Sequence, residues 1–298
     1  MAKLNTHKAS ATQRVLLFGP PKSGKTQLAG ELSEHFNLIW IDMENGHETL
    51  FKFPEEWQER INLIDLKDTP DYPIAIETVL KIIKCKPVKI CEEHGKVACM
   101  ICNREGKEFN EIDLGSLSQD TIVVFDSMTQ LTTSAINNIT KTEADDYKMK
   151  TDDWGSLSKL IELFLATIQQ ARYNCVVISH EIEAESEGKK KTLVPVAGSR
   201  NSSRNSAKAF DHVVYAERKN KKHVFASATD YATNILTGSR TDIVLEGAAK
   251  PSLLAIFKPE LYKELNKGAA TPTATANIAT KPNGGEKATD ILARLRSK

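Results

Sequence analysis

The residues with the clearest chemical role form the segment Gly19-Pro20-Pro21-Lys22-Ser23-Gly24-Lys25-Thr26, which fits the pattern G-x-x-x-x-G-K-[ST]. An apolar run from Arg14 to Phe18 predicts a strand before it, and Gln27 to Leu32 predict a helix after it. In this setting backbone N–H groups can surround phosphates, Lys25 can reach the outer phosphates and Thr26 can bind Mg²⁺. The segment, together with the adjacent Gln27, therefore predicts binding of ATP and Mg²⁺.

Acidic residues follow two further apolar runs. Leu38 to Ile41 lead into Asp42-Met43-Glu44, and Thr121 to Phe125 lead into Asp126. The carboxyl ends of parallel strands meet at one edge of a sheet, where α/β proteins bind ligands. We expect Asp126 to hold Mg²⁺ and Glu44 to orient or deprotonate the attacking water, with a helix-capping or solvated glutamate as the alternative for Glu44.

A third run, Cys175 to Ser179, ends in His180, where a sensor of the γ-phosphate would sit. The expected catalytic set is thus Lys25, Glu44 and His180. Buried strands alternating with helical segments predict an α/β fold with a mostly parallel central sheet flanked by helices.

Four residues have the spacing of metal ligands: Cys91, His94, Cys99 and Cys102, in the pattern C-x2-H-x4-C-x2-C. Sulfur and imidazole ligands in two close pairs predict a structural, tetrahedral Zn²⁺ site. Cys85 could replace one ligand, and chance clustering of small buried residues is the alternative. Polar neighbours predict a zinc knuckle within residues 85–113 that projects from the core, facing DNA or a protein partner.

Cations concentrate after His180, where the chain reads as a loop. Charged and small polar side chains suit a phosphate backbone, so this segment is the expected DNA contact, with a solvated loop as the alternative. The candidate residues are Lys189, Lys190, Lys191, Arg200, Arg204 and Lys208. Residues 212–216 and 223–226 then predict a hairpin with a cationic tip.

Composition limits the class of protein. The 298 residues carry a net charge of +1, which argues against a coat of nucleic acid but permits a local basic groove. The sequence shows neither an apolar run long enough to span a membrane nor a signal peptide. Five cysteines, four of them clustered, favour a reducing cytoplasm over a disulfide framework.

Composition also predicts the division of the chain. We expect a flexible arm over residues 1–13 and an ATPase core over 14–260. Residues 261–287, rich in Ala, Thr, Pro and Gly toward their end, predict a disordered linker. Residues 288–298 predict a short helix that docks a partner, with a frayed terminus as the alternative.

These motifs resemble the RecA branch of P-loop ATPases, in which a carboxylate follows the second strand as Glu44 does here. More closely, the chain is similar to phage RecA-like single-strand annealing proteins of the Sak type, the phage nucleotide-binding proteins. The likeness spans residues 14–247. Its stretches outside the P-loop region are Thr121 to Gln130, Asp152 to Ile161, Val194 to Tyr215 and Tyr231 to Leu245.

The resemblance implies a RecA-like core that binds single-stranded DNA and promotes annealing and recombination in the host cytoplasm. It also implies a ring or filament of identical subunits, a single-strand-binding protein as partner of the tail, and Lys219, Lys221 and Lys222 reaching a neighbouring subunit's nucleotide. The cysteine-rich insertion and the missing terminal domains of bacterial RecA are departures. An ATPase that loads or remodels a complex without annealing, and a nucleotide-dependent scaffold with negligible turnover, remain alternatives.

Overall fold

A mostly parallel sheet organises the computed structural model, which describes residues 12–144, 146–185, 191–219, 222–227, 234–240 and 252–266. The sheet has eight strands in the order β11-β10-β1-β7-β6-β2-β3, with β12 pairing with β10. All pairings from β10 to β3 are parallel, whereas β11 and β12 run antiparallel to β10. The strands are β1 (Arg14–Phe18), β2 (Asn37–Asp42), β3 (Ile61–Asp65), β6 (Thr121–Asp126), β7 (Asn174–Ser179), β10 (His212–Lys219), β11 (Lys222–Ala226) and β12 (Gly238–Ser239).

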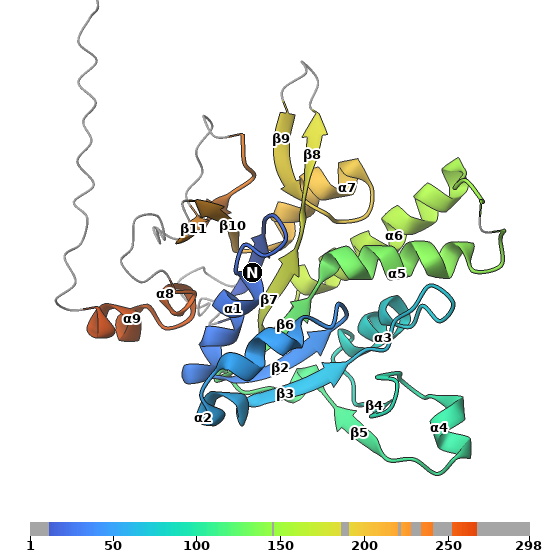
Figure 1. The fold of residues 1–298 in the computed structure, drawn as a ribbon, viewed down its shortest axis with the longest axis horizontal. Coiled ribbons are helices and arrows are strands. Elements are labelled where there is room, and N and C mark those ends of the chain that lie inside the picture. Colours follow the sequence, from blue (N-terminus) through green and yellow to red (C-terminus); the bar gives the residue numbers. More distant parts are fainter. Residues whose placement is uncertain are drawn as a thin grey trace, which may run out of the picture. The chain divides into compact units, whose positions relative to one another are not determined.

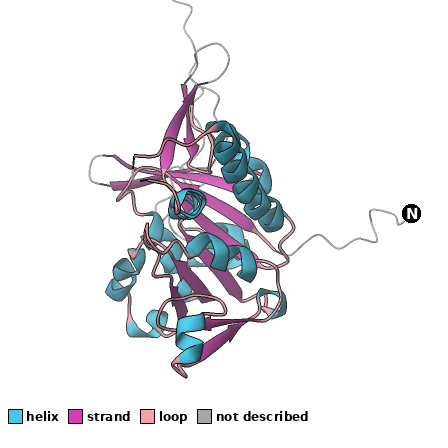
Figure 2. Cartoon of the chain, turned by 90° about the vertical axis from the view of Figure 1, so that its right-hand side faces the viewer, coloured by secondary structure: helices cyan, strands magenta, loops and turns pink. Residues whose placement is uncertain are grey.

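The central strands are buried on both faces. Every residue of β6 and β7 is buried, as expected for apolar strands in the middle of a parallel sheet. Val123 and Phe125 of β6 belong to the core on one face, and Ile122 and Val124 to the core on the other. Because each face needs an apolar cover, helices lie on both sides of the sheet, as Figure 2 shows. The predicted α/β fold is confirmed.

Helices α3 (Ala75–Ile82), α5 (Met128–Thr140) and α6 (Thr151–Gln169) pack on one face, and α1 (Lys25–Gly30) and α8 (Leu254–Phe257) pack on the other. On the first face Phe164 of α6 meets Phe125 of β6 edge to face at 5.6 Å. Among the described residues no helix combines the length and the apolar character needed to cross a bilayer. The remaining helical segments are α2 (Glu55–Gln58), α4 (Met100–Arg104), α7 (Arg200–Asn205), α9 (Pro259–Leu265), and the 3-10 turns η2 (Glu31–Glu34), η3 (Gly46–Lys52), η4 (Leu114–Ser116) and η5 (Ser206–Ala209).

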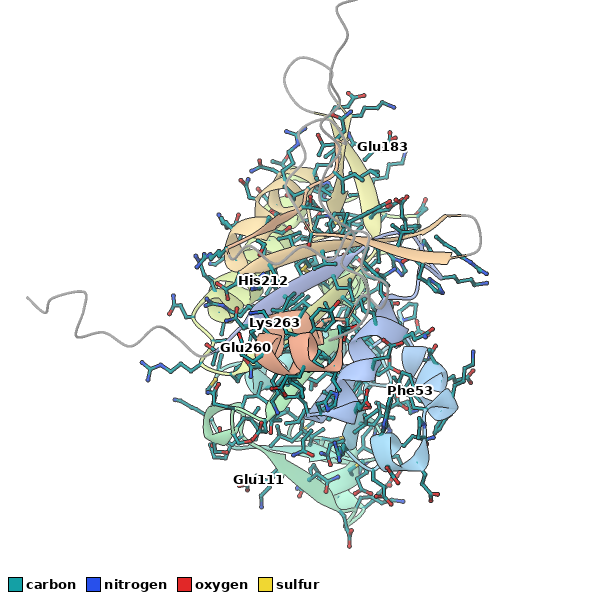
Figure 3. The ribbon with its side chains drawn as sticks, turned by 90° about the vertical axis from the view of Figure 1, so that its left-hand side faces the viewer. Phe53, Glu111, Glu183, His212, Glu260 and Lys263 are labelled. Carbon is teal, nitrogen blue, oxygen red and sulfur yellow. The ribbon has the colours of Figure 1, made fainter. Side chains whose placement is uncertain are left out.

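Two hairpins stand apart from the main sheet. One is formed by β4 (Val88–Cys91) and β5 (Phe109–Ile112), lies within the predicted insertion and carries α4 between its strands. The other is formed by β8 (Glu181–Glu185) and β9 (Lys191–Pro195) directly after β7. The hairpins lie at opposite ends of the described fold, where Figure 3 labels Glu111 on β5 and Glu183 on β8.

The segment after His180 differs from its sequence-based description as a loop. It forms β8, β9 and α7, which Figure 1 shows together beside β7. Farther along, α9 reaches Leu265 and so includes the first residues of the predicted linker. The rest of that linker, the predicted helix at 288–298 and residues 1–11 of the predicted arm lie outside the described residues.

Candidate functional site

The glycine segment lies between β1 and α1, where the sequence places it. Gly19 has a φ of +150°, and a Cβ on it would lie 1.9 Å from the carbonyl oxygen of Ala216 on β10. Gly24, with a φ of +94°, precedes the first turn of α1. A side chain fits neither position without moving the backbone, since left-handed conformations favour glycine and Gly19 also has no free space. The loop is therefore tightly packed and presents its N–H groups at one edge of the sheet.

Lys25 lies across this loop. Its Nζ donates hydrogen bonds to the carbonyl oxygens of Gly19 at 3.0 Å and Pro20 at 2.8 Å, and the residue is only 6% exposed. Burial lowers the pKa of Lys25 to about 8, although the nearby carboxylates of Asp126 and Glu44 oppose the change. A partly desolvated ammonium group gains stability from an anion, and triphosphate oxygens would meet that need.

Thr26 and Asp126 meet at the ends of α1 and β6. The Thr26 hydroxyl donates to Asp126 Oδ2 at 3.2 Å, and Asp126 is 2% exposed. Burial raises the pKa of Asp126 to about 7, and the charges of Glu44 and Asp42 add to the rise. Hydroxyl and carboxylate oxygens are the ligands that Mg²⁺ prefers, and it keeps several waters besides a few protein ligands. The pair therefore fits a Mg²⁺ ion shared with phosphates.

Glu44 follows β2 on a loop that Asp42 holds in place. Asp42 is fully buried and accepts hydrogen bonds from the backbone N–H groups of Glu44 at 2.9 Å, Gly46 at 3.2 Å and His47 at 3.0 Å. The His47 ring lies 2.5 Å from the same carboxylate. Asn45 within the loop has a φ of +56°, a conformation that asparagine tolerates. Asp42 thus acts on the position of Glu44 through the backbone.

The Glu44 carboxylate contacts two other elements. It accepts a hydrogen bond from Ser127 Oγ after β6, and its Oε2 lies 3.4 Å from His180 Nε2 after β7. Burial acts to raise the pKa of Glu44, but the hydrogen bonds with His180 and Ser127 and the charges of His180 and Lys25 outweigh it, so the pKa is lowered. Glu44 is consequently ionised at neutral pH and can accept a proton.

These side chains surround one pocket of about 400 Å³. It brings together five residues predicted from the sequence: Lys25, Thr26, Glu44, Asp126 and His180. Lys22, Ser23, Gly24 and Gln27 also line it, whereas Gly19, Pro20 and Pro21 form the start of the loop. A pocket of this size and charge is suited to a magnesium–nucleotide complex.

Comparison with known proteins agrees with this site. A model of the AAA domain family matches residues 11–241. The chain belongs to the AAA domain family. The matched range contains the glycine loop, Glu44, Asp126 and His180, and it supports a nucleotide-binding ATPase. No curated protein matched this AAA domain chain.

One solved structure similar to the AAA domain chain is a prototypical ATPase from the type III secretion system of pathogenic bacteria. The two share 16% sequence identity with a TM-score of 0.37, and the match covers 69% of this chain. It spans about half of that protein, 52% of its length.

Sequence reasoning missed three basic side chains of the pocket, Lys52, Arg218 and His223, as well as Thr49 and Ile178. Arg218 and His223 come from β10 and β11. In this hairpin we had instead predicted a role for Lys219, Lys221 and Lys222 at its cationic tip. Lys219 and Lys222 pair at the end of the hairpin, and Lys221 lies outside the described residues. The motif does not reveal that β10 pairs with β1, so the nearness of Arg218 to the loop had no local signal.

The four predicted metal ligands converge at a second site. In the part of the chain that the structure describes, Cys91, His94, Cys99 and Cys102 place their ligand atoms within 4.8 Å of one another. His94 Nδ1 lies 3.2 Å from Cys102 Sγ, 3.8 Å from Cys99 Sγ and 3.9 Å from Cys91 Sγ. Ligands on a tetrahedron with Zn–S of about 2.3 Å would be roughly 3.5 to 3.8 Å apart. The four residues, hereafter the Cys3His cluster, thus have the spacing of a zinc site.

Cys85 is not part of the Cys3His cluster, so the alternative in which it replaces a ligand receives no support from the geometry. The three cluster thiols are at most 1% exposed. Burial raises the pKa of Cys102 to about 12, and hydrogen bonds with Cys91 and Cys99 add to this. Such crowding of thiols is relieved when a cation binds their thiolates.

The hairpin that carries the Cys3His cluster rests against the core and does not project freely as the sequence led us to expect. Lys67, after β3, donates its N–H to the His94 carbonyl at 3.2 Å. A Cβ on Gly95 would lie 2.5 Å from the carbonyl oxygen of Asp65, so the backbones touch there. Lys96 Nζ contacts the Tyr72 hydroxyl at 3.2 Å.

A chain of hydrogen bonds leads from Asp68, in the loop after β3, toward the nucleotide pocket. Gln130 Nε2 donates to Asp68 Oδ2 at 3.2 Å, and the Gln130 N–H donates to Ser127 Oγ at 3.3 Å. Ser127 in turn donates to Glu44. The loop that contacts the β4–β5 hairpin is thereby linked to the Glu44 carboxylate in the pocket.

The predicted DNA-binding residues are distributed over three elements. Arg200 and Arg204 are exposed on α7, and Lys208 is exposed on η5. Lys191 begins β9 and pairs with Glu183 at 3.0 Å, whereas Lys189 and Lys190 lie outside the described residues.

Serines of the same segment do not remain available for phosphate. Ser202, Ser203 and Ser206 are at most 4% exposed, and Ser203 Oγ accepts the N–H of Ala197 at 3.0 Å. Ser206 Oγ donates to the Ser203 carbonyl at 2.8 Å. The expectation that these three hydroxyls contact DNA is wrong, because they are buried and hold the helix on the fold, whereas the cations and Asn201 and Asn205 are exposed.

Proposed function

We propose that the protein is a Mg²⁺-dependent ATPase in which Glu44 is the general base. The observation that carries this proposal is the position of Glu44 in one pocket with Lys25 and Asp126. Membership of the AAA domain family supports a nucleoside triphosphate as the ligand of that pocket.

Each side chain has a separate role. Lys25 exchanges its carbonyl contacts for oxygens of the outer phosphates, and the loop N–H groups hold the remaining charge. Thr26 and Asp126 hold Mg²⁺, which neutralises phosphate charge when bound. Most of the acceleration of phosphoryl transfer comes from such positioning and charge stabilisation.

Positioning alone does not remove a proton from the attacking water, and Glu44 supplies this step. Its lowered pKa keeps it ionised, so it can take a proton as the water oxygen bonds to the γ-phosphorus and the bond to the β-phosphate oxygen breaks. Ser127 and His180 fix the direction of the carboxylate. His180 lines the same pocket and would register the presence of the terminal phosphate.

The test is Glu44→Gln. Loss of the base should slow ATP turnover by about 10²- to 10⁴-fold, the usual contribution of general acid–base catalysis, while ATP affinity stays near that of the wild type. Steady-state phosphate release and binding of a fluorescent ATP analogue give the two values. Glu48→Gln, on the exposed side of the same loop, is the matched control.

A wild type that binds ATP without turnover would make the protein a nucleotide-dependent scaffold. Normal turnover in Glu44→Gln would assign the base to another residue.

The Cys3His cluster fits Zn²⁺ as a structural ion. Three thiolates and an imidazole are ligands that select zinc, and all four positions of a tetrahedron would be filled by protein atoms. A closed coordination shell leaves no place for substrate, so the role of the ion is to hold the β4–β5 hairpin together.

We further propose that the ATPase binds single-stranded DNA and promotes annealing. The supporting observation is that Arg200 and Arg204 lie one helical turn apart, exposed, and without a carboxylate partner among the described residues. Free guanidinium groups at this spacing are suited to successive phosphates.

Arg200→Ala combined with Arg204→Ala should weaken binding of labelled single-stranded DNA and reduce the slope of log K against log salt by about 1.4, or 0.7 for each lost phosphate contact. Lys148→Ala with Arg172→Ala removes two other exposed cations and is the control. An unchanged slope would place DNA elsewhere. DNA binding and ATP turnover without faster annealing would favour an ATPase that loads or remodels a complex.

A further inference from the structure

The β10–β11 hairpin extends over the glycine loop of its own chain. β10 pairs in parallel with β1 up to Phe18 and Tyr215, and it then continues beyond the end of β1. At that point the Ala216 carbonyl contacts Gly19. Residues 217–219 of β10 therefore run beside the phosphate loop, and β11 returns antiparallel with His223 opposite Arg218.

His223 fixes the hairpin on the loop. Its Nδ1 lies 2.7 Å from the Ser23 carbonyl oxygen. A Cβ on Gly24 would lie 2.7 Å from the same Nδ1, so the ring packs directly on the loop backbone. The absence of a side chain at Gly24 is what admits this ring. His223 thereby sets the distance between the hairpin and any phosphate held by the loop.

Arg218 lines the same pocket as Lys25, Glu44 and Asp126. Within the described part of the chain no carboxylate pairs with it and no hydrogen bond engages its guanidinium. A guanidinium group without a partner, beside a phosphate loop, has the chemistry for two parallel hydrogen bonds to phosphate oxygens. Lys25 and Arg218 come from different elements, α1 and β10, so the two cations can contact different phosphate oxygens.

We infer that Arg218 binds the terminal phosphate of the ATP held by its own subunit, with His223 as the positioning residue. This inference rests on the proposed ATPase function and extends it. It differs from the expectation drawn from the RecA resemblance, in which cations of this hairpin reach the nucleotide of a neighbouring subunit. A guanidinium in this place distinguishes ATP from ADP, because only ATP carries the phosphate it contacts.

The first test is Arg218→Ala, compared with Arg218→Lys and with Arg172→Ala as an exposed control. Arg218→Ala should weaken ATP binding by about 10- to 100-fold, the range for hydrogen bonds to charged groups, and change ADP binding little. Arg218→Lys should recover part of the loss, since it keeps the charge but not the paired hydrogen bonds. Thermal melting without nucleotide checks that all variants fold.

The second test mixes Lys25→Ala with Arg218→Ala in equal amounts. If the arginine acts within its own subunit, the mixture is no more active than the two variants measured apart. If it acts on a neighbour, mixed assemblies regain about a quarter of the wild-type turnover, because that share of the sites combines an intact loop with an intact arginine. Such recovery overturns the inference.

The outcomes also separate this inference from the proposed function. A wild type without ATP turnover contradicts the proposed ATPase. An active wild type whose Arg218→Ala variant binds ATP and ADP unchanged contradicts only the role of Arg218.

Discussion

The nucleotide pocket and the Cys3His cluster both gather charged or soft ligand atoms, but they are assembled in different ways. The ligands of the cluster all come from residues 91–102 and are held by one hairpin. The pocket combines residues that follow β1 and β2 with residues of α1, β6, β7, β10 and β11, between Lys22 and His223. One site is local and closed, and the other depends on the order of strands in the whole sheet.

This difference predicts opposite relations between ligand and fold. A closed site of buried thiols is stable when its ion is bound, so metal binding and local folding are one event. The pocket is held open by a buried sheet, so the fold persists without nucleotide and the ligand can exchange. Experiments that remove one ligand group from each site test this contrast.

The largest effect is expected for Cys99→Ser. Binding of zinc to such sites contributes on the order of 10 kcal/mol, and a hydroxyl is a poor substitute for a thiolate. Zinc content should fall to near zero and limited proteolysis should cut within residues 86–112. ATP affinity should remain within about threefold, because none of the cluster ligands lines the nucleotide pocket.

Cys85→Ser, outside the Cys3His cluster, is the control and should retain the metal. Full zinc content in Cys99→Ser would remove that residue from the site. An equal loss of ATP affinity would show that the two regions fold as one.

A smaller effect is expected for Asp126→Asn in metal-free protein. Burial and the charges of Glu44 and Asp42 raise the pKa of Asp126 from 3.8 to about 7. Between about pH 4 and 7 the folded protein therefore binds a proton that the unfolded chain releases, and stability falls as the pH rises through this window. The variant lacks this penalty and should be more stable at pH 8, by at most about 4 kcal/mol.

Denaturant unfolding at pH 4 and pH 8 in chelator measures this effect, with the exposed Asp71→Asn as control. The gain should be present at pH 8 and small at pH 4. Addition of Mg²⁺ and ATP should stabilise the wild type and not the variant. Equal stability of variant and wild type at pH 8 would contradict the raised pKa.

The smallest of the three effects is expected for Lys25→Ala. Loss of a charged contact to phosphate should weaken ATP binding by about 100-fold, or about 2.7 kcal/mol. Stability without nucleotide should change little, because a partly desolvated ammonium group is removed with its carbonyl contacts. Isothermal titration and thermal melting measure the two properties.

Lys22→Ala removes an exposed cation of the same loop and should weaken binding much less. Unchanged ATP affinity in Lys25→Ala would contradict the site.

Local patterns in the sequence predicted the parts of the molecule that depend on short segments. The glycine loop, the acids at the ends of β2 and β6, and the Cys3His cluster each carry their signal within a few residues. Arg218 and His223 were missed because their nearness to the loop requires β10 to lie next to β1. No spacing along the chain reveals that neighbour.

Residues 181–185 were read as a loop because of their acidic side chains. They form β8, in which Ala184 is buried while the glutamates around it face outward. The alternation of small and charged residues is typical of a strand, but the high charge of the segment favoured a loop in the sequence-based prediction. Among the serines of α7, the sequence could not show which hydroxyls face the interior.

Asp42 orders the loop after β2 before any nucleotide binds. Its carboxylate is buried and accepts hydrogen bonds from three backbone N–H groups of this loop and contacts the His47 ring, so the loop is ordered as soon as the sheet has formed. Immobilising a flexible loop of this length during binding would cost several kcal/mol of conformational entropy. Because folding has already ordered the loop, this entropy cost does not oppose nucleotide binding. The Glu44 carboxylate is therefore oriented before the nucleotide arrives.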